Sequence, residues 1–394
     1  MSAQAGGALR GGRLLRVVGG LVGLVVLVVL AVLPLLSGTS NATLLTLTLM
    51  LTSIGVAVNW NLTGGFTGYV DFGHAVWFGI GAYATAILIS LQPNGPQVGW
   101  HPVPAIVVGA LVAGVLAAAI GRATMRLKGP YFSIAMLGTF VAVREIVRVW
   151  SPLTGGGVGL TLPPYLNRQL FYYVELALVV LLVSFTWWLR RTRFGAALVA
   201  IREDEIGAET RGIDTTRLKT AIFSFAGLST GLFGALWAYQ NTFVDPDIAF
   251  VEVRTIDAVM GTMLGGLGTV AGPVLGAAAL YWLREVLWAN LLDYHLLTQG
   301  VLLIVVVLFV PRGLVGLVDR RGASLAEVWG WKGRRRGGGA ADRLTEEGLG
   351  DSAAAGPAGG DRDGPAQARA GSEPGSGAQG ETAAGGDAET EALS

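Results

Sequence analysis

The sequence of 394 residues contains no cysteine, three lysines and three histidines. Without cysteine the chain forms no disulfide framework, thiol nucleophile or thiolate metal site. Its lysines, at 128, 219 and 332, lie outside any Gly-x-x-x-x-Gly-Lys-Ser/Thr phosphate loop. The chain therefore does not hydrolyse ATP by that route. The sequence shows no pattern of a nucleophile with its base or of clustered metal ligands, which disfavours an enzyme.

Charged residues are also scarce. They make up 14% of the chain, against roughly a quarter in ordinary soluble domains. Hydrophobic residues make up 52%, and a soluble fold of this length cannot cover so much apolar sequence with polar surface. The composition predicts a membrane protein.

Apolar runs recur along most of the chain. A membrane-spanning helix needs about 20 mostly apolar residues, and about ten stretches fit that length. They are 18–37, 42–62, 66–90, 103–121, 129–150, 171–189, 218–241, 252–269, 272–290 and 295–311. The first, fourth, sixth and tenth are predicted to be continuous apolar helices. The third and eighth are rich in glycine and are predicted to be broken or re-entrant. The predicted fold class is an all-α polytopic membrane protein with about ten transmembrane helices.

Basic residues divide the loops into two sets. Lys and Arg cluster in residues 10–16, 122–128, 190–219 and 312–336, whereas the loops at 92–101 and 244–252 are neutral or acidic and the loop at 151–169 has one Arg. An even number of spans puts all four clusters on one side. The positive-inside rule assigns that side to the cytoplasm, together with both termini. We expect a multi-pass protein of the inner (cytoplasmic) cell membrane.

The charge balance changes near the C-terminus. Residues 1–336 hold 25 basic and 16 acidic residues, whereas residues 337–394 hold 3 and 11. The cytoplasmic loops account for the basic excess, so nucleic acid is not an expected partner. The predicted divisions are a cytoplasmic tail at 1–17, a transmembrane domain at 18–318, and an acidic cytoplasmic tail at 319–394. The last tail is expected to be disordered because it has little aliphatic bulk to bury.

The longest cytoplasmic loop, residues 190–219, carries a mixed apolar and charged pattern. Ile201, Ala208 and Ile213 can share one side of a short helix that Gly212 would end. Such a helix, lying flat under the membrane, could dock in a groove on a partner. The alternative is a solvated charged loop, which the pattern alone slightly favours.

Four motifs follow one another in order. They are Asn61–Gly68 with Gly73–Tyr83, Pro130–Arg148 with Leu153–Gly159, the charged loop at 202–214, and the glycine-rich segment at 264–277. Their order and spacing resemble those of branched-chain amino acid ABC transporter permeases of the LivM type, over about residues 40–318. Asp71, Arg144 beside Glu145, and the acidic tail depart from the family pattern.

The resemblance implies a permease subunit that moves Leu, Ile and Val inward. A second permease subunit would complete a heterodimer, two cytoplasmic ATPase subunits would use the ATP, and an extracytoplasmic binding protein would deliver the substrate. The chain itself would hold no cofactor. The residues that match the family's ATPase-coupling loop are Arg202, Glu203, Asp204, Ala208, Glu209, Gly212, Ile213 and Asp214. Arg202 and the carboxylates would contact the ATPase.

Two alternatives stay open. Related ABC permeases for urea, short amides or sugars share much of this pattern. An ion-coupled secondary transporter is disfavoured, because it predicts inverted repeats and a buried carboxylate at the midplane, and the charges in these spans are expected near the span ends.

Small and polar residues within the spans are candidates for the translocation pathway, because glycine lets helices approach closely and frees backbone groups. The candidates are Asn61, Gly64, Gly65, Gly68, His74, Thr154, Gly155, Gly156, Gly265, Gly266 and Gly268. Tight structural packing is the alternative for the glycines. For His74 we expect hydrogen bonds to backbone carbonyls, and no metal, because the other histidines lie in external loops.

Ionisable residues in a span are costly unless they are paired or face a cavity. Arg144, Glu145 and Arg148 have a spacing that suits ion pairs on one helical face. Arg254 and Asp257 have the same three-residue spacing, and Arg284 precedes Glu285. We expect structural ion pairs near span ends, with contact to the binding protein as the alternative for the first set.

Overall fold

The computed structural model describes residues 25, 28–35, 40–90, 98–164, 167–290 and 300–301. The chain divides into two compact units, Met1–Lys332 and Gly333–Ser394. The second unit lies wholly outside the described residues, as do the predicted tails at 1–17 and 319–394 and most of the tenth predicted span.

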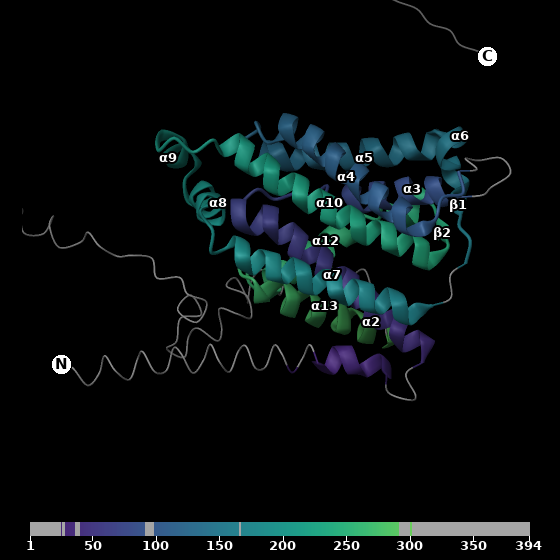
Figure 1. The fold of residues 1–394 in the computed structure, drawn as a ribbon. Coiled ribbons are helices and arrows are strands. Elements are labelled where there is room, and N and C mark those ends of the chain that lie inside the picture. The colour runs from purple at the N-terminus through teal and green to yellow at the C-terminus, as the bar shows by residue number, and fades with distance from the viewer. Residues whose placement is uncertain are drawn as a thin grey trace, which may run out of the picture. The chain divides into compact units, whose positions relative to one another are not determined.

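The described residues are almost entirely helical, which confirms the predicted all-α class (Figure 1). The longer helices are α2 (Asn41–Trp60), α3 (Ala75–Ile89), α4 (Pro102–Thr124), α5 (Pro130–Val149), α7 (Arg168–Leu189), α8 (Arg193–Glu203), α10 (Thr215–Asn241), α12 (Val253–Gly265) and α13 (Ala271–Asn290). The shorter elements are η1 (Leu33–Leu35), the π-helical turn η2 (Asn61–Gly65), α6 (Ser151–Thr154), η3 (Gly156–Val158), β1 (Leu160–Thr161), α9 (Glu205–Thr210), β2 (Phe243–Val244) and α11 (Pro246–Ala249).

Four of the described helical segments are long and apolar enough to cross a membrane: Asn41–Gly65, Pro102–Thr124, Arg168–Leu189 and Thr215–Asn241. In contrast, α3 has 15 residues and α12 has 13, fewer than the roughly 20 that a bilayer requires. The backbone before α3 is not helical over residues 68–74, and α12 ends at Gly265. The predicted breaks in the third and eighth spans are confirmed.

Helix α10 lies at the centre of the packing. It contacts α3 and α4 along its length and also reaches α2, α7 and α8. A Cβ atom on Gly81 of α3 would lie 2.0 Å from the carbonyl oxygen of Gly231 in α10. The two backbones therefore touch, and only glycine fits. Lipid and apolar side chains are equally apolar, so this close packing, rather than burial from water, holds helices together in a membrane.

A second group consists of α2, α7, α12 and α13. Helices α12 and α13 form a hairpin whose turn contains Gly266 with φ 130° and Gly268 with φ 70°. A Cβ atom on Gly265 would lie 1.7 Å from the carbonyl oxygen of Gly272. This glycine pair lets the two helices fold back on each other directly.

The loops gather at two ends. Helices α8 and α9 lie at one end, and α6, β1 and β2 lie at the other (Figure 1). Strands β1 and β2 pair antiparallel, with Leu160 opposite Val244. Lys128, from the basic loop between α4 and α5, reaches Glu209 of α9 at 3.7 Å. Two of the four basic clusters therefore share an end, as the charge pattern predicted.

Candidate functional site

The predicted coupling loop folds into two helices, so neither the single short helix nor the solvated loop that the pattern slightly favoured is correct. Asp204 has extended backbone (φ −157°, ψ 102°) and separates α8 from α9. Its carboxylate accepts a hydrogen bond from the backbone N–H of Gly207 at 3.0 Å and caps α9. Ile201 and Ala208 are both buried, as their pattern predicted, but they lie on different helices. Gly212, at φ 81°, turns the chain after α9.

Arg202, at the end of α8, contacts its own chain. Its Nη1 donates to the carbonyl oxygen of Gly65 at 2.6 Å. Arg202 is nevertheless exposed, so its predicted contact with the ATPase stays a prediction, and the hydrogen bond fixes its guanidinium to the end of the π-helical turn η2. Cβ atoms on Gly68 and Gly268 would lie 3.2 Å and 2.5 Å from the Arg202 side chain. Both glycines leave room for this arginine.

Asn61 links the π-helical turn η2 to the turn between α12 and α13 by two hydrogen bonds. Its Nδ2 donates to the carbonyl oxygen of Thr269 at 2.9 Å, and its Oδ1 accepts from the backbone N–H of Gly268 at 2.8 Å. Four predicted pathway residues (Asn61, Gly65, Gly68, Gly268) therefore gather around one predicted coupling residue. We call this set, with Arg202, the hinge cluster.

A second link joins α9 to the bundle. The Nζ of Lys219, which is 1% exposed, donates to Glu205 Oε1 at 2.6 Å and to the Tyr69 hydroxyl at 2.9 Å. The Tyr69 hydroxyl donates to Glu205 Oε2 at 2.5 Å. Burial opposes ionisation of Glu205, but the hydrogen bonds from Lys219 and Tyr69 outweigh it and lower the pKa of this carboxyl. We call Tyr69, Glu205 and Lys219 the anchor triad.

The outer face of α8 and α9 stays open. Glu203, Asp204 and Glu209 are exposed, and the apolar side chain of Ile206 is 66% exposed. Asp214 caps α10 by accepting from the backbone N–H of Arg217 at 3.0 Å.

His74 lies in the centre of the bundle and is fully buried. Its Nδ1 lies 3.0 Å from Asp71 Oδ2, and its Nε2 lies 3.0 Å from Thr230 Oγ1. Its partners are thus side chains, not the backbone carbonyls we expected. The sequence departure at Asp71 has a structural reason, because this carboxylate orients the imidazole.

Three other pathway candidates lie at the far end, by α6 and η3. The Thr154 hydroxyl donates to the carbonyl oxygen of Val147 at 2.6 Å, and Gly155 and Gly156 have φ 74° and 60°. They form the turn after α5. Gly64, Gly265 and Gly266 lie with η2 and the α12–α13 turn. The predicted pathway set is therefore divided among three places in the fold.

The ion pairs of α5 form as predicted and extend further. Glu145 Oε1 lies 3.4 Å from both Arg144 Nε and Arg148 Nη1. Arg144 Nη1 also reaches Glu252 Oε1 at 3.1 Å, and Arg148 pairs with Asp247 of α11. These pairs fasten α5 to the segment between β2 and α12.

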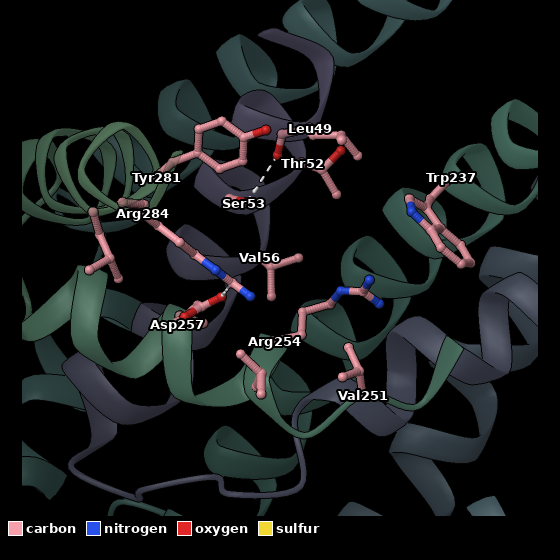
Figure 2. A pocket seen from close by; sticks show the side chains of 14 residues that line it. Leu49, Thr52, Ser53, Val56, Trp237, Val251, Arg254, Asp257, Tyr281 and Arg284 are labelled. Atoms are coloured by element: carbon pink, nitrogen blue, oxygen red, sulfur yellow. Dashed lines mark hydrogen bonds and ion pairs between the residues drawn. The ribbon is translucent and has the colours of Figure 1, made fainter. Parts of the chain in front are cut away.

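A cavity of about 380 Å³ lies among α2, α10, α12 and α13. Arg254 and Asp257 both line it, but the ion pair predicted between them is not formed, because Asp257 pairs instead with Arg284 of α13 (Figure 2). The remaining lining is mostly apolar: Leu49, Thr52, Ser53, Val56, Trp237, Val251, Val253, Ala258, Ala277, Leu280 and Tyr281.

One buried carboxylate was missed. Glu175 of α7 is fully buried, and its Oε2 accepts from the Thr52 hydroxyl at 2.6 Å. The sixth predicted span therefore contains a buried ionisable residue. In the sequence, a lone glutamate within an apolar run was the signal for this buried carboxylate. The anchor triad had no such signal, because Tyr69 lies 136 residues from Glu205. The described residues contain no group of three or more His, Asp or Glu that could hold a metal ion.

Long apolar helices, short broken helices and a charged helical pair at one end define a polytopic helical membrane protein of the permease type. The family model described as "Branched-chain amino acid transport system / permease component" matches residues 38–310. The chain belongs to this family.

Curated relatives agree with this assignment. The chain is 29% identical over 310 residues to the high-affinity branched-chain amino acid transport system permease protein LivM of Escherichia coli K12, covering 71% of this chain and 70% of the relative. It is 26% identical over 280 residues to LivH of the same organism, covering 66% and 90%. The autoinducer 2 import system permease protein LsrC of Escherichia coli O9:H4 is 31% identical over 245 residues, covering 58% and 68%. No solved structure matches.

Proposed function

We propose that this chain is a permease subunit of an ABC importer that moves branched-chain amino acids inward, driven by two partner ATPase subunits. The names of the LivM and LivH relatives support the cargo. Similarity to both of these permease proteins also supports a heterodimer with a second, related permease. An extracytoplasmic binding protein would deliver the substrate, and ATP would be bound by the partners alone.

The α8–α9 end would face the cytoplasm, with both termini on that side. The basic loops at 122–128 and 190–219 support this orientation, because Lys and Arg are retained on the cytoplasmic side. The opposite end, with α6, β1 and β2, would then face the binding protein. The exposed carboxylates Asp247 and Glu252 lie there, beside Arg144 and Arg148.

The observation that carries the proposal is the geometry of α8 and α9. Ile206 projects outward between exposed carboxylates, while the anchor triad and Arg202 fix the inner face to the bundle. An apolar side chain that enters a pocket on the ATPase would give affinity, and the carboxylates would give orientation. Any movement of the docked helices would pass directly to η2 and α10.

The test uses the complete transporter in proteoliposomes, with leucine uptake and ATP hydrolysis measured together. Ile206→Ser should weaken docking by about 10- to 100-fold, since burying such a side chain contributes about 1.5–3 kcal/mol, and should lower uptake. Ile206→Leu, which keeps the apolar area, is the matched control and should retain both activities. Normal coupled uptake in Ile206→Ser would count against the docking role.

The carboxylates are tested through Glu203 rather than Asp204. Asp204 caps α9, so Asp204→Ala would also disturb the helix. Glu203→Gln removes only an exposed charge and should lower the rate of uptake at moderate salt. High salt should reduce the difference from wild type, because it screens exposed charges. An effect that does not depend on salt would argue against electrostatic docking.

Two other functions each have one observation in their favour. Similarity to LsrC favours a permease for a hydroxylated solute, and uptake of such a solute with no uptake of leucine would establish it. The buried Glu175 favours ion coupling. In that case a protonophore should abolish uptake in ATP-loaded vesicles. Under the main proposal uptake continues in its presence.

A further inference from the structure

The cavity among α2, α10, α12 and α13 has an unusual charge composition for the interior of a membrane protein. Among the described residues, its lining carries two guanidinium groups, on Arg254 and Arg284, and a single carboxylate, on Asp257. Arg284 and Asp257 form an ion pair. The described residues of the lining therefore carry one more positive than negative charge, and a buried charge is costly unless an opposite charge joins it.

Arg254 is the side chain with bonding capacity to spare. Its Nη1 donates to the carbonyl oxygen of Ala249 at 3.3 Å, and its guanidinium lies 3.7 Å from the ring centroid of Phe78 and 5.2 Å from that of Trp237. Aromatic faces attract a cation but accept no hydrogen bond in the guanidinium plane. Within the described part of the chain, Arg254 forms no ion pair. Its fork of N–H donors suits a carboxylate, which can accept two of them.

The rest of the lining suits a small aliphatic group. Leu49, Val56, Val251 and Leu280 supply apolar walls, and the volume of about 380 Å³ falls in the range of ligand cavities, about 300–1,000 Å³. Figure 2 shows Arg254 extending toward Trp237 and Arg284 reaching Asp257. A solute with an aliphatic end and a carboxylate end would match both parts of the cavity.

We propose that this cavity is a subsite for an apolar α-amino acid, with Arg254 as the ligand of its carboxylate and Asp257 beside its ammonium group. This inference rests on the proposed function and narrows it. Urea, short amides and sugars are neutral and would leave the excess charge unmatched. The cavity thus selects within the permease itself, in addition to the binding protein.

The test measures binding to the complete transporter in nanodiscs, without the binding protein, by fluorescence quenching. The probes are L-leucine, 4-methylpentanoate and 4-methylpentanamide, which differ in their ionic groups but share the aliphatic end. Leucine and the carboxylate should bind about 10- to 100-fold more tightly than the amide, as a hydrogen bond to a charged group predicts. Equal binding of the acid and the amide would overturn the proposal.

Two variants locate the site. Arg254→Gln should abolish the preference for the carboxylate. If that variant does not fold, Ser53→Leu tests the site instead. The larger side chain fills the cavity and leaves the charged residues in place, so it should abolish leucine binding. Ser224→Leu is its matched control: both serines donate to the carbonyl four residues earlier, but Ser224 does not line the cavity. Leucine binding that survives Ser53→Leu would refute the site.

Two further readouts separate the remaining explanations. Adding phosphatidylglycerol to phosphatidylcholine nanodiscs should leave leucine binding unchanged; displacement of leucine would make the cavity a lipid site and refute the inference. ATP-driven leucine uptake is measured in parallel with the binding protein present. Uptake without carboxylate-dependent binding refutes the subsite alone, whereas carboxylate-dependent binding without uptake refutes the proposed function alone.

Discussion

The anchor triad offers a quantitative test of how α9 is held. In Glu205→Ala the ammonium group of Lys219 stays buried, at 1% exposure, without its carboxylate. Breaking a buried pair from one side costs about 3–5 kcal/mol. We use the lower limit, about 3 kcal/mol, because the Glu205 side chain is 16% exposed and the Tyr69 hydroxyl remains close to the ammonium. That loss changes the ratio of folded to unfolded protein roughly 100-fold.

The assay is unfolding of the purified chain in mixed micelles by titration with sodium dodecyl sulfate, followed by the fluorescence of its 11 tryptophans. The double variant Glu205→Ala/Lys219→Met should lose less stability than Glu205→Ala alone, because no unpaired charge remains buried. Arg217→Ala is the matched control. It breaks the exposed pair with Asp214, whose side chains are 83% and 51% exposed, and should cost about 0.5 kcal/mol.

The pH dependence follows from the lowered pKa of Glu205. A carboxyl whose pKa is lower in the folded state stabilises the fold above its ordinary pKa, and this contribution disappears as pH falls through the folded value. The difference between wild type and Glu205→Ala should therefore be constant near neutral pH and shrink only in the acidic range below 4.5, the ordinary value. Equal losses for Glu205→Ala and Arg217→Ala, or a double variant that is additive, would refute the reasoning.

Three further predictions concern the helices and their contacts. Gly81→Ala should prevent stable folding, because its new Cβ meets the backbone oxygen of Gly231 at 2.0 Å; a monodisperse size-exclusion peak at normal yield would contradict this. Gly138→Ala in α5, where nothing lies within 4 Å, should instead stabilise by about 0.5–1 kcal/mol in the same micelle titration. Asn61→Leu should lose about 2 kcal/mol or more, since it leaves two backbone groups of the α12–α13 turn unpaired; unchanged stability would show that Asn61 does not hold that turn.

Some expectations from sequence were wrong for identifiable reasons. A helical pattern through Ile201 and Ala208 predicted one helix, but the pattern cannot show that Asp204 bonds to its own downstream backbone and starts a second one. The family resemblance assigned Arg202 to the contact with the ATPase, which stays a prediction, but it did not indicate that Arg202 also binds its own chain. Its acceptor, Gly65, is 137 residues away, and a backbone carbonyl leaves no mark in sequence.

The sequence by itself determined the class of protein, the main helices and their breaks. Apolar runs of sufficient length must be buried in lipid as helices, and glycine segments end or interrupt them, as in α3 and α12. The positions of basic residues separated the two sets of loops. The Lys and Arg content of each loop can be read directly from the sequence, and it predicts the side of the membrane on which the loop lies. Family membership followed from motif order over the same stretches.

Only the tertiary structure decided which distant groups meet. Lys219 and Tyr69 are 150 residues apart, and the pair of Arg284 with Asp257 depends on how α12 folds back on α13. Sequence spacing predicts partners within one helix, three or four residues apart. Partners on different helices depend on packing and register, which backbone contacts such as Gly81 against Gly231 set. The hinge cluster, the anchor triad and the charged cavity therefore arise from the fold, although every residue in them is ordinary in the sequence.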